Sequence, residues 1–550
     1  MSTRPARPGP LWEIAVRLCL LSDTHIGAAR AVPRHAAEGD VDLRVDRDPR
    51  TGVPRLRATT LAGLLRHELA ARTGDPRQVG RLFGAAGSGP PPGGEPDAPA
   101  ESALDVDDAA AELPEGTTVA VRVGTRVDPA SGTVRPGRMW QWEVLPAGTV
   151  FTAHLRLRVP VPADEALLLD LLVLAADGFS GEGPGIRVGG RTGRGHGAVR
   201  ATHWTAERYD LTDEHAWFAY HARSWADRWE RGAAALADAP ADLSAALAAR
   251  LRAHGRAATA ARPEARPDRP DRRHRAELRL TLAVAEQPDP AGPPPRRPRP
   301  GLIMVGDVPA PERLGTVDRA HRHRPVVSDA DKASVRLAPV LGDTALFALF
   351  KRIGGRLVRD AAEHLGAEGA RWQEWHSHWW GADTDPGSAR PRPSRVRLRA
   401  VPPLRGGAHL TATRLTVDSL FGDAVDGRVF TSDLHCGGSG EAVLDVRDPD
   451  DAVRGLLVLV VRELATVPFD TLGAGAGSGN GRLTATRAAL TTWSGDGGPP
   501  HRVDLLTALF DPGSAEAATA RGWVSALGTR LAPGDGAARG ERGTRAGGER

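Results

Sequence analysis

Apolar residues in the first half of the chain follow the periods of strands and of helices. Ile14, Val16, Leu18 and Leu20 occupy every second position, which predicts a strand with one buried face. Leucines spaced three and four residues apart predict helices that bury one face each. The patterns predict, in order, a strand at 14–20, a helix at about 59–72, strands near 118–127 and 151–159, a helix at about 164–177 and a strand from 198.

The second half repeats this order of elements. Leu278, Leu280, Leu282 and Val284 open it with the same strict alternation. The predicted elements that follow are a helix at about 343–365, strands near 408–417 and 440–447, a helix at about 450–465 and a strand at 482–490. Strand, helix, two strands, helix and strand is the order of a split βαβ sheet. The sequence therefore predicts an α+β fold of two tandem ferredoxin-like (RRM-like) domains with loop insertions.

Segments rich in Pro, Gly and Arg divide the chain, because they bury too little apolar surface to offset the cost of ordering them. We expect a first domain at 1–210, a helical and Pro/Arg-rich linker at 211–275, a second domain at 276–495 and a C-terminal extension at 496–550, disordered from about 533. The expected insertions are a thumb-like loop at 28–48, a Pro/Gly insertion at 85–100 and a Trp-rich insertion at 366–400.

Composition narrows the class of protein further. Two cysteines among 550 residues, Cys19 and Cys436, exclude a disulfide framework and a four-cysteine zinc site. The sequence has no apolar run long enough to span a bilayer and no signal peptide, so we expect a cytoplasmic protein without a membrane partner. Net charge is only +4, and nearly all the basic residues are Arg, which we attribute mainly to compositional bias.

In each half, one Gly-rich loop precedes the last predicted strand. Glycine allows positive φ and a close approach of backbone amides to phosphate, and Arg can clamp the same phosphates. We therefore expect the loops to bind an RNA backbone; a solvated hairpin is the alternative, and for the second loop it is about equally favoured. The candidate residues are Arg187, Arg191, Arg194, His196 and Arg200 in the loop at 181–200, and Arg482 after the loop at 473–481.

The segment 22–70 carries three short motifs in a fixed order. They are His25-Ile26-Gly27, then Asp48-Pro49 with Thr51, Gly52 and Pro54, then Thr59-Thr60-Leu61 with Gly63 and Arg66. In this order they resemble the RAMP superfamily, and in particular the backbone subunits of type III CRISPR effector complexes. The likeness covers nearly all of 12–204 and is looser in the second half. Ala62 replaces the usual Lys at the helix start, a loss that Arg57 or Arg66 could cover.

The resemblance implies a guide-RNA-binding backbone subunit of a type III antiviral effector complex. Its partners would be guide RNA, complementary target RNA and other CRISPR effector subunits. Besides the Gly-rich loops, the residues implied to bind RNA are His25, Arg44, Arg47, Arg57, Thr59, Thr60, Arg66, Arg322 and Arg324.

The resemblance also implies a candidate cleavage residue. An acidic residue before the Asp-Pro motif supports target-RNA cleavage in such subunits, and by spacing it is Asp42, with Asp40 and Asp46 close by. Asp42 would hold a divalent cation, Mg²⁺ or Mn²⁺, or orient the attacking 2′-hydroxyl; otherwise no cofactor is expected. By spacing from Asp329, the matching position in the second half is His323, so we expect that half not to cleave.

Several alternatives stay open. One is a non-catalytic RNA scaffold, and another is a metal-free endoribonuclease that processes guide RNA through His25 and His35. The stretch 22–27 also resembles the first metal motif of calcineurin-like phosphoesterases, but the later motifs of that family are missing. The Trp clusters around Trp217–Trp229 and Trp372–Trp380 could stack on bases, although packing in a core or against a neighbouring subunit is the favoured interpretation.

Overall fold

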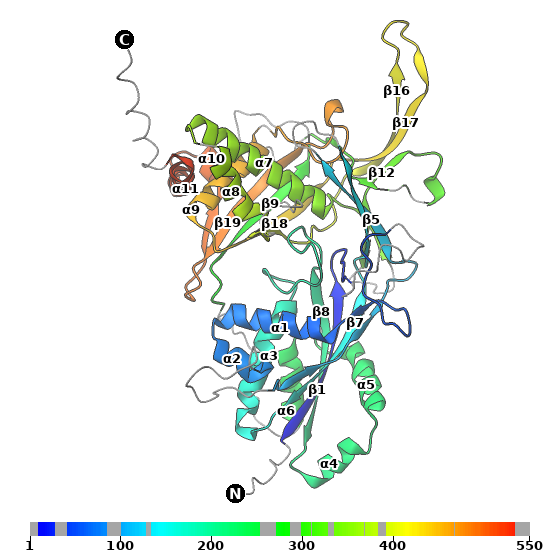
Figure 1. Cartoon of the computed structure of the whole chain (residues 1–550), viewed down its shortest axis with the longest axis vertical. Helices are drawn as coiled ribbons and strands as arrows, with labels where there is room; N and C mark the ends of the chain where they lie inside the picture. The colour runs from blue at the N-terminus through cyan, green and yellow to red at the C-terminus, as the bar shows by residue number, and fades with distance from the viewer. Residues whose placement is uncertain are drawn as a thin grey trace, which may run out of the picture. The chain divides into compact units, whose positions relative to one another are not determined.

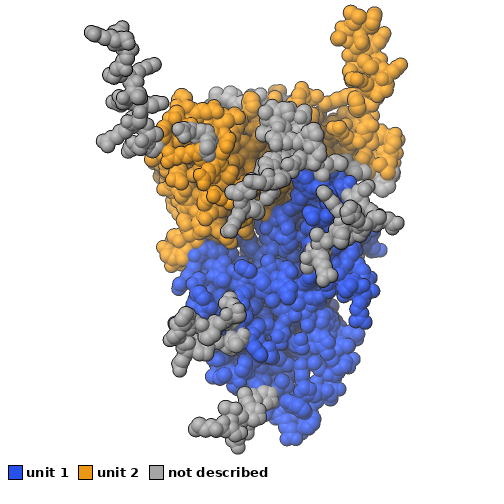
Figure 2. Space-filling view, viewed as in Figure 1, with its two compact units in different colours: residues 1–192, 196–273, 327–335 blue, residues 193–195, 274–326, 336–550 orange. Residues whose placement is uncertain are grey.

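The computed structural model forms two compact units (Figure 1, Figure 2). Unit 1 comprises residues 1–192, 196–273 and 327–335, and unit 2 comprises residues 193–195, 274–326 and 336–550. The structure describes residues 9–27, 41–84, 101–127, 134–253, 271–285, 299–307, 309, 311–327, 335–367, 369–382, 392–466 and 468–533.

Unit 1 is built on an antiparallel sheet whose central strand is the first one in the chain. Its strand order is β8-β1-β7, with β3 and β4 both pairing with the outer edge of β7. The strands are β1 (Pro10–Leu20), β2 (Arg55–Leu56), β3 (Leu104–Val106), β4 (Ala109–Glu112), β7 (Val150–Arg158) and β8 (Val199–Asp210). This is the strand order of a ferredoxin-like sheet.

Helices cover one face of this sheet and create the core of unit 1. The alternating apolar residues of β1 and β7 point at the leucine faces of the helices, as the sequence predicts. The helices are α1 (Ala58–Thr73), α2 (Pro76–Phe83) and α3 (Glu165–Ala176). A buried ion pair between Arg208 and Glu165 ties β8 to the start of α3, and Trp12 donates to the same carboxylate.

The other face of the sheet is covered by α5 (Trp225–Ala234), after α4 (Glu214–His221) and before α6 (Leu243–Ala253). The His154 ring on β7 stacks on Trp229 with 3.9 Å between ring centroids, and a pocket of about 340 Å³ remains beside it. The segment expected to be a linker at 211–275 thus packs on unit 1 as far as α6, whose Leu247 is fully buried. The division between the units falls after residue 273, because the apolar face of α6 completes the first core.

Unit 2 has a sheet with the strand order β15-β18-β9-β19-β20. Its strands are β9 (Arg275–Val284), β15 (Val396–Leu398), β18 (Ser439–Arg447), β19 (Leu483–Trp493) and β20 (His501–Asp504). Its helices are α7 (Asp343–His364), α8 (Gly369–Trp380), α9 (Asp451–Ala465), α10 (Leu505–Phe510) and α11 (Ala515–Leu531). Short strands outside this sheet are β10 (Leu302–Ile303), β11 (Gly306–Asp307), β12 (Arg319–His321), β13 (His323–Val327) and β14 (Val335–Pro339).

Two expected peripheral segments are part of the unit 2 core. In the Trp-rich insertion, Trp375, Trp379 and Trp380 of α8 are buried, which confirms the packing interpretation. The segment expected as a C-terminal extension forms α10 and α11, and α11 packs along α9 with Trp523 buried. The tail from 534, the Pro/Gly insertion at 85–100 and residues 28–40 of the thumb-like loop lie outside the described residues.

Two hairpins stand apart from the main sheets, and both correct the predicted strand roles. The hairpin of unit 1 joins β5 (Ala120–Val127) to β6 (Val134–Val144), and that of unit 2 joins β16 (Ala408–Val417) to β17 (Ala424–Cys436). The strands predicted near 118–127 and 408–417 are therefore hairpin strands. The edge places of the sheets are taken by the three-residue strands β3 and β15. Figure 1 shows β16 and β17 extending from the body of unit 2.

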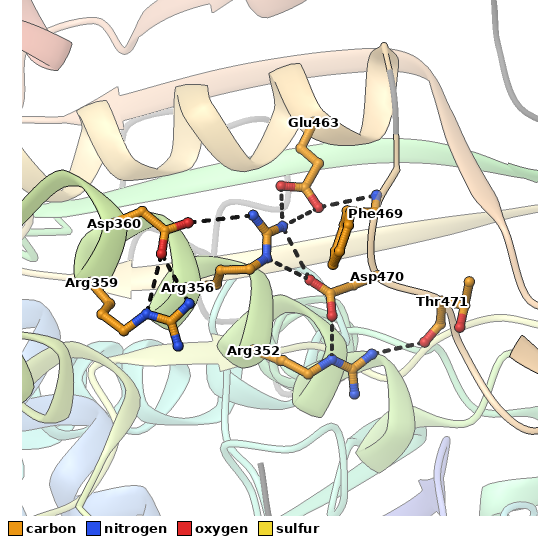
Figure 3. A network of polar contacts seen from close by, with 8 residues as sticks. All are labelled: Arg352, Arg356, Arg359, Asp360, Glu463, Phe469, Asp470 and Thr471. Carbon is orange, nitrogen blue, oxygen red and sulfur yellow. Dashed lines mark hydrogen bonds and ion pairs between the residues drawn. The ribbon is translucent and has the colours of Figure 1, made fainter. Parts of the chain in front are cut away.

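A network of ion pairs joins α7 to α9 and to the segment that leads into the second Gly-rich loop (Figure 3). Arg356 on α7 lies between Glu463 of α9 and Asp470, and it contacts both carboxylates. Arg352, one turn earlier on α7, donates to Asp470 and to the carbonyl oxygen of Thr471. The network thereby holds the start of the Gly-rich loop against both helices.

Among the helices in the described ranges, none combines the length and the apolar character that a membrane crossing requires.

Candidate functional site

In unit 1 the His-Ile-Gly turn after β1 and the Gly-rich loop before β8 form one backbone assembly. The amide of Gly190 donates to the carbonyl oxygen of His25 over 2.9 Å. Gly189 has φ +82°, and a Cβ atom there would lie 2.2 Å from the same oxygen, so only glycine fits. Nδ1 of His25 lies 2.7 Å from the carbonyl oxygen of Glu143 on β6. Turn, loop and hairpin are thus held together at one end of the sheet.

Asp42 is exposed at the edge of this assembly, and the hairpin holds it through two hydrogen bonds. Its amide donates to the carbonyl oxygen of Gln141 over 3.0 Å, and its Oδ2 accepts from the Gln141 amide over 2.8 Å. The other carboxylate oxygen has no partner among the described residues. Asp42 is therefore an anchored carboxylate with one oxygen available to a ligand.

The two acids beside Asp42 do not compete with it for this role. Asp46 is buried and forms ion pairs with Arg57 and Arg55. The hydrogen bond from Arg57 lowers the pKa of Asp46 despite its burial. Asp40 lies outside the described residues.

The Asp-Pro motif is a structural turn. Oδ1 of Asp48 accepts hydrogen bonds from the amides of Arg50 and Thr51, both over 2.9 Å. Gly52 closes the turn with φ +71°, where a side chain would be strained. The motif thereby positions the strand that leads into α1.

The residues expected to bind RNA differ in exposure. Those on the surface are Arg44, Thr59, Arg194 and Arg200. Those that are half-buried are Arg47, Arg57, Thr60, Arg66, Arg187, Arg191, Arg322 and Arg482. Those that are buried are His25, His196 and Arg324.

Several of the expected arginines are engaged inside their units, among them Arg324, Arg66 and Arg57. Arg324 is buried, pairs with Asp343 and donates to the carbonyl oxygen of Val401, so the expectation of a surface RNA contact is wrong for it. Arg66 donates to two carbonyl oxygens at the C-terminal end of α2, those of Phe83 and Gly84, each over 3.1 Å. Arg57 forms two hydrogen bonds with Asp46. Neither Arg66 nor Arg57 is a ready substitute for the missing Lys, because each guanidinium already serves the fold.

An aromatic pair on β6 joins the site and was not singled out from the sequence. The Arg191 guanidinium lies 3.9 Å from the ring centroid of Trp142 and 5.5 Å from that of Trp140. Arg191 has φ +59°, a conformation that a non-glycine residue adopts at some cost. The alternation of Trp140 and Trp142 along one face of a strand was the available signal. The Gly-rich loop is thus pinned to the hairpin by a cation–π contact.

The described residues do not form a metal site on their own. Within the described ranges, no group of three or more His, Cys, Asp or Glu side chains is arranged to hold an ion. Asp42 supplies one carboxylate, and one of its oxygens is already occupied by the Gln141 amide. Because this donor set does not fit a resident Mg²⁺ or Mn²⁺, we derive no reaction step through a metal ion.

Unit 1 is an α+β domain in which the His-Ile-Gly turn, Asp42 and the Gly-rich loop gather at one end of a ferredoxin-like sheet. Residues 17–200 match the family model of the RAMP superfamily. No curated protein matches the chain. The matched range runs from β1 to the start of β8 and includes the His-Ile-Gly turn, Asp42 and the Gly-rich loop. The match shows that this part of the chain is similar to the RAMP superfamily.

Proposed function

We propose that the chain is a tandem of two RAMP domains and serves as a guide-RNA-binding backbone subunit of a type III CRISPR effector complex. The observation that carries the tandem is the pair of Gly-rich loops. In unit 2 the amide of Ala474 donates to the carbonyl oxygen of Met304 over 2.9 Å, as Gly190 does to His25 in unit 1. A Cβ atom on Gly473 would lie 2.1 Å from the Met304 oxygen, the same close approach as at Gly189.

The far ends of the two loops match as well. The amide of Val188 donates to the carbonyl oxygen of Gly197 over 2.8 Å, and that of Leu472 donates to Gly481 over 2.7 Å. A Cβ atom on Gly197 would lie 2.1 Å from the carbonyl oxygen of Val188, and a Cβ atom on Gly481 would lie 2.1 Å from that of Leu472. The order of the four main strands, β8-β1-β7-β3 and β19-β9-β18-β15, is also the same. Such agreement at several independent contacts supports duplication of one domain.

RNA binding through the loops is favoured over binding on the sheet of unit 1. Many RRM domains stack bases on an open sheet face. Here α5 covers that face, and His154 and Ala15 lie beneath it. The exposed Arg44 and Arg200 lie instead in the segment after the His-Ile-Gly turn and at the end of the Gly-rich loop. The loop end of the sheet is thus the surface that supports guide binding.

We assign target cleavage in unit 1 to Asp42. A carboxylate held rigidly by the Gln141 amide can accept a hydrogen bond from a 2′-hydroxyl and orient it toward the adjacent phosphate. A scaffold without cleavage activity is the second candidate, since Asp42 also has a structural bond to the hairpin. Guide processing through histidines has less support, because His25 is buried with Nδ1 bonded and His35 lies outside the described residues.

The test is cleavage of target RNA by the assembled complex carrying Asp42→Asn. Asn keeps an oxygen that can accept from the Gln141 amide and removes the negative charge. We expect cleavage at the unit 1 position to fall by about 10²-fold or more while guide RNA is retained. Asp48→Asn is the matched control, because Asp48 is another acid of this segment that accepts backbone hydrogen bonds. Undiminished cleavage in Asp42→Asn would favour the scaffold.

A further inference from the structure

The second unit holds an aspartate in the same backbone setting as Asp42. The amide of Asp318 donates to the carbonyl oxygen of Thr431 over 2.9 Å, and its Oδ2 accepts from the Thr431 amide over 2.7 Å. The corresponding distances between Asp42 and Gln141 are 3.0 Å and 2.8 Å. In each unit the acid therefore closes a reciprocal pair of hydrogen bonds with one residue on the second strand of the hairpin.

The residues after each acid repeat the same pairing with that strand. Leu43 pairs in parallel with Trp142, and Arg319 pairs in parallel with Ser432. Each partner directly follows the residue that holds the acid, Gln141 or Thr431. The two aspartates thus stand at the same register position of equivalent strands.

The pairing continues in step on the other side of the segment. Val45 pairs with Gly27, and His321 pairs with Gly306, each three residues after the acid. One residue further, Asp46 donates its amide to Ile26 over 2.7 Å, and Arg322 donates its amide to Val305 over 2.8 Å. Since both flanks agree, the match between Asp42 and Asp318 does not depend on one contact.

The electrostatic setting is also alike. Both aspartates are exposed, and neither has an ion pair with any residue in the described ranges. The acid two residues further along each hairpin strand, Glu143 or Asp433, is neutralised instead: Glu143 pairs with Arg47, and Asp433 pairs with Arg313. Each unit therefore keeps one anchored carboxylate whose second oxygen has no partner among the described residues.

We propose that Asp318 is a second cleavage carboxylate, so that the chain cuts target RNA at two positions, one for each unit. The inference rests on the proposed function of the chain and replaces the expectation that His323 stands where the acid should be. Counting back from Asp329 assumed equal loop lengths in the two halves. The hydrogen bonds place the equivalent of Asp42 at Asp318, five residues before His323.

The reaction at each position is a transesterification within the RNA. The 2′-oxygen forms a bond to the adjacent phosphorus, the bond from phosphorus to the 5′-oxygen breaks, and a 2′,3′-cyclic phosphate and a 5′-hydroxyl result. The aspartate accepts the proton of the 2′-hydroxyl, and water supplies the proton taken up by the leaving 5′-oxygen. No redox partner is required.

The experiment compares four complexes purified with their guide RNA: wild type, Asp42→Asn, Asp318→Asn and the double variant. The substrate is end-labelled RNA complementary to the sequenced guide, assayed in Mg²⁺ and in EDTA. We expect two cuts with wild type at early times. Each single variant should lose one of them by about 10²-fold or more, and the double variant should lose both.

The control is Asp418→Asn. Asp418 is a partly exposed acid on the same hairpin that accepts from two backbone amides, those of Leu420 and Phe421. It should leave both cuts unchanged. Equal guide content and an equal thermal midpoint show that Asp318→Asn acts on the reaction and not on folding.

The outcomes separate this inference from the proposed function. Two cuts that persist in Asp318→Asn, or a single cut that depends on Asp42 alone, overturn the role of Asp318 and leave the rest standing. Wild-type complex that retains guide and target but makes no cut overturns cleavage at both positions and leaves an RNA scaffold.

Discussion

At the scale of single residues, the surroundings of His321 in unit 2 keep its imidazole ring neutral. Burial lowers the pKa of His321 to about 3, and repulsion from His435 and His323 adds to the effect. Its Nδ1 accepts a hydrogen bond from the amide of Val305 over 3.2 Å, which a protonated ring could not do. The neutral ring is therefore part of the packing between β12 and the segment after β10.

This pKa predicts how stability depends on pH. In the unfolded chain the ring has its ordinary pKa of 6.5, so between about pH 6.5 and 3 the unfolded state binds more protons. Stability must then fall as the pH decreases through this window, by up to about 1.4 kcal/mol per pH unit for this residue. His321→Asn keeps an acceptor near Nδ1 and removes the titration, so we expect a shallower fall.

Urea unfolding of wild type and His321→Asn at several pH values between 7 and 4 measures the difference in slope. The absolute stability of the variant also changes because the ring volume is lost, so the slope is the relevant quantity. His501→Asn, at an exposed histidine of the same unit, is the control and should not alter the slope. Parallel curves for wild type and His321→Asn would contradict the prediction.

At the scale of elements, Arg356 joins α7, α9 and the approach to the second Gly-rich loop (Figure 3). Its side chain is 23% exposed, while its partners Glu463 and Asp470 are only 9% and 12% exposed. Replacing Arg356 by Met leaves the poorly hydrated Glu463 without its cation and leaves Asp470 with Arg352 alone. We expect a loss of about 2 to 4 kcal/mol in the free energy of unfolding at pH 7, measured by urea denaturation.

Arg359→Met is the matched control on the same helix. Arg359 pairs with Asp360, and both side chains are about half exposed, so the expected change is within about 0.5 kcal/mol. A similar small change for both variants would show that the network around Arg356 contributes little to stability.

The elements also show what the sequence can and cannot predict. Long segments with a strong period, such as β1, α1 and α9, lie within a few residues of their predicted places. The edge strands were assigned wrongly for a physical reason. β3 and β15 have three residues each, too few to show a period, whereas β5 and β16 are long enough to be predicted as strands but pair within hairpins outside the main sheets.

At the scale of the whole molecule, the two units are equivalent in contacts that the sequence does not show. Asp42 and Gln141 lie 99 residues apart, and Asp318 and Thr431 lie 113 residues apart. Insertions of different length separate the partners in the two units. Counting residues along the chain therefore gives His323 as the counterpart of Asp42, whereas the backbone hydrogen bonds give Asp318. The His-Ile-Gly and Asp-Pro motifs of unit 1 could be found in the sequence because they are short and local. At the turn of unit 2, Met304 and Val305 stand where unit 1 has His25 and Ile26; the backbone contacts are kept, and of the three residue types only the glycine is, as Gly306.

The charge of the molecule bears on how it binds RNA. A net charge of +4 over 550 residues gives little long-range attraction, so binding through the proposed loop surface should depend on a few local arginines. Arg44, Arg194 and Arg200 are the candidates on the surface. Each phosphate contact with single-stranded RNA contributes about 0.7 to the slope of log affinity against log salt concentration. Replacing all three arginines by Ala should therefore lower the slope by about 2. The measurement is titration of labelled single-stranded RNA at NaCl concentrations from roughly 50 to 300 mM.

Arg66→Ala is the control. Arg66 holds the end of α2, so this variant should change thermal stability and leave the slope as it is. A slope unchanged in the triple variant would place the RNA on another surface, because counterion release follows the phosphates that are actually contacted.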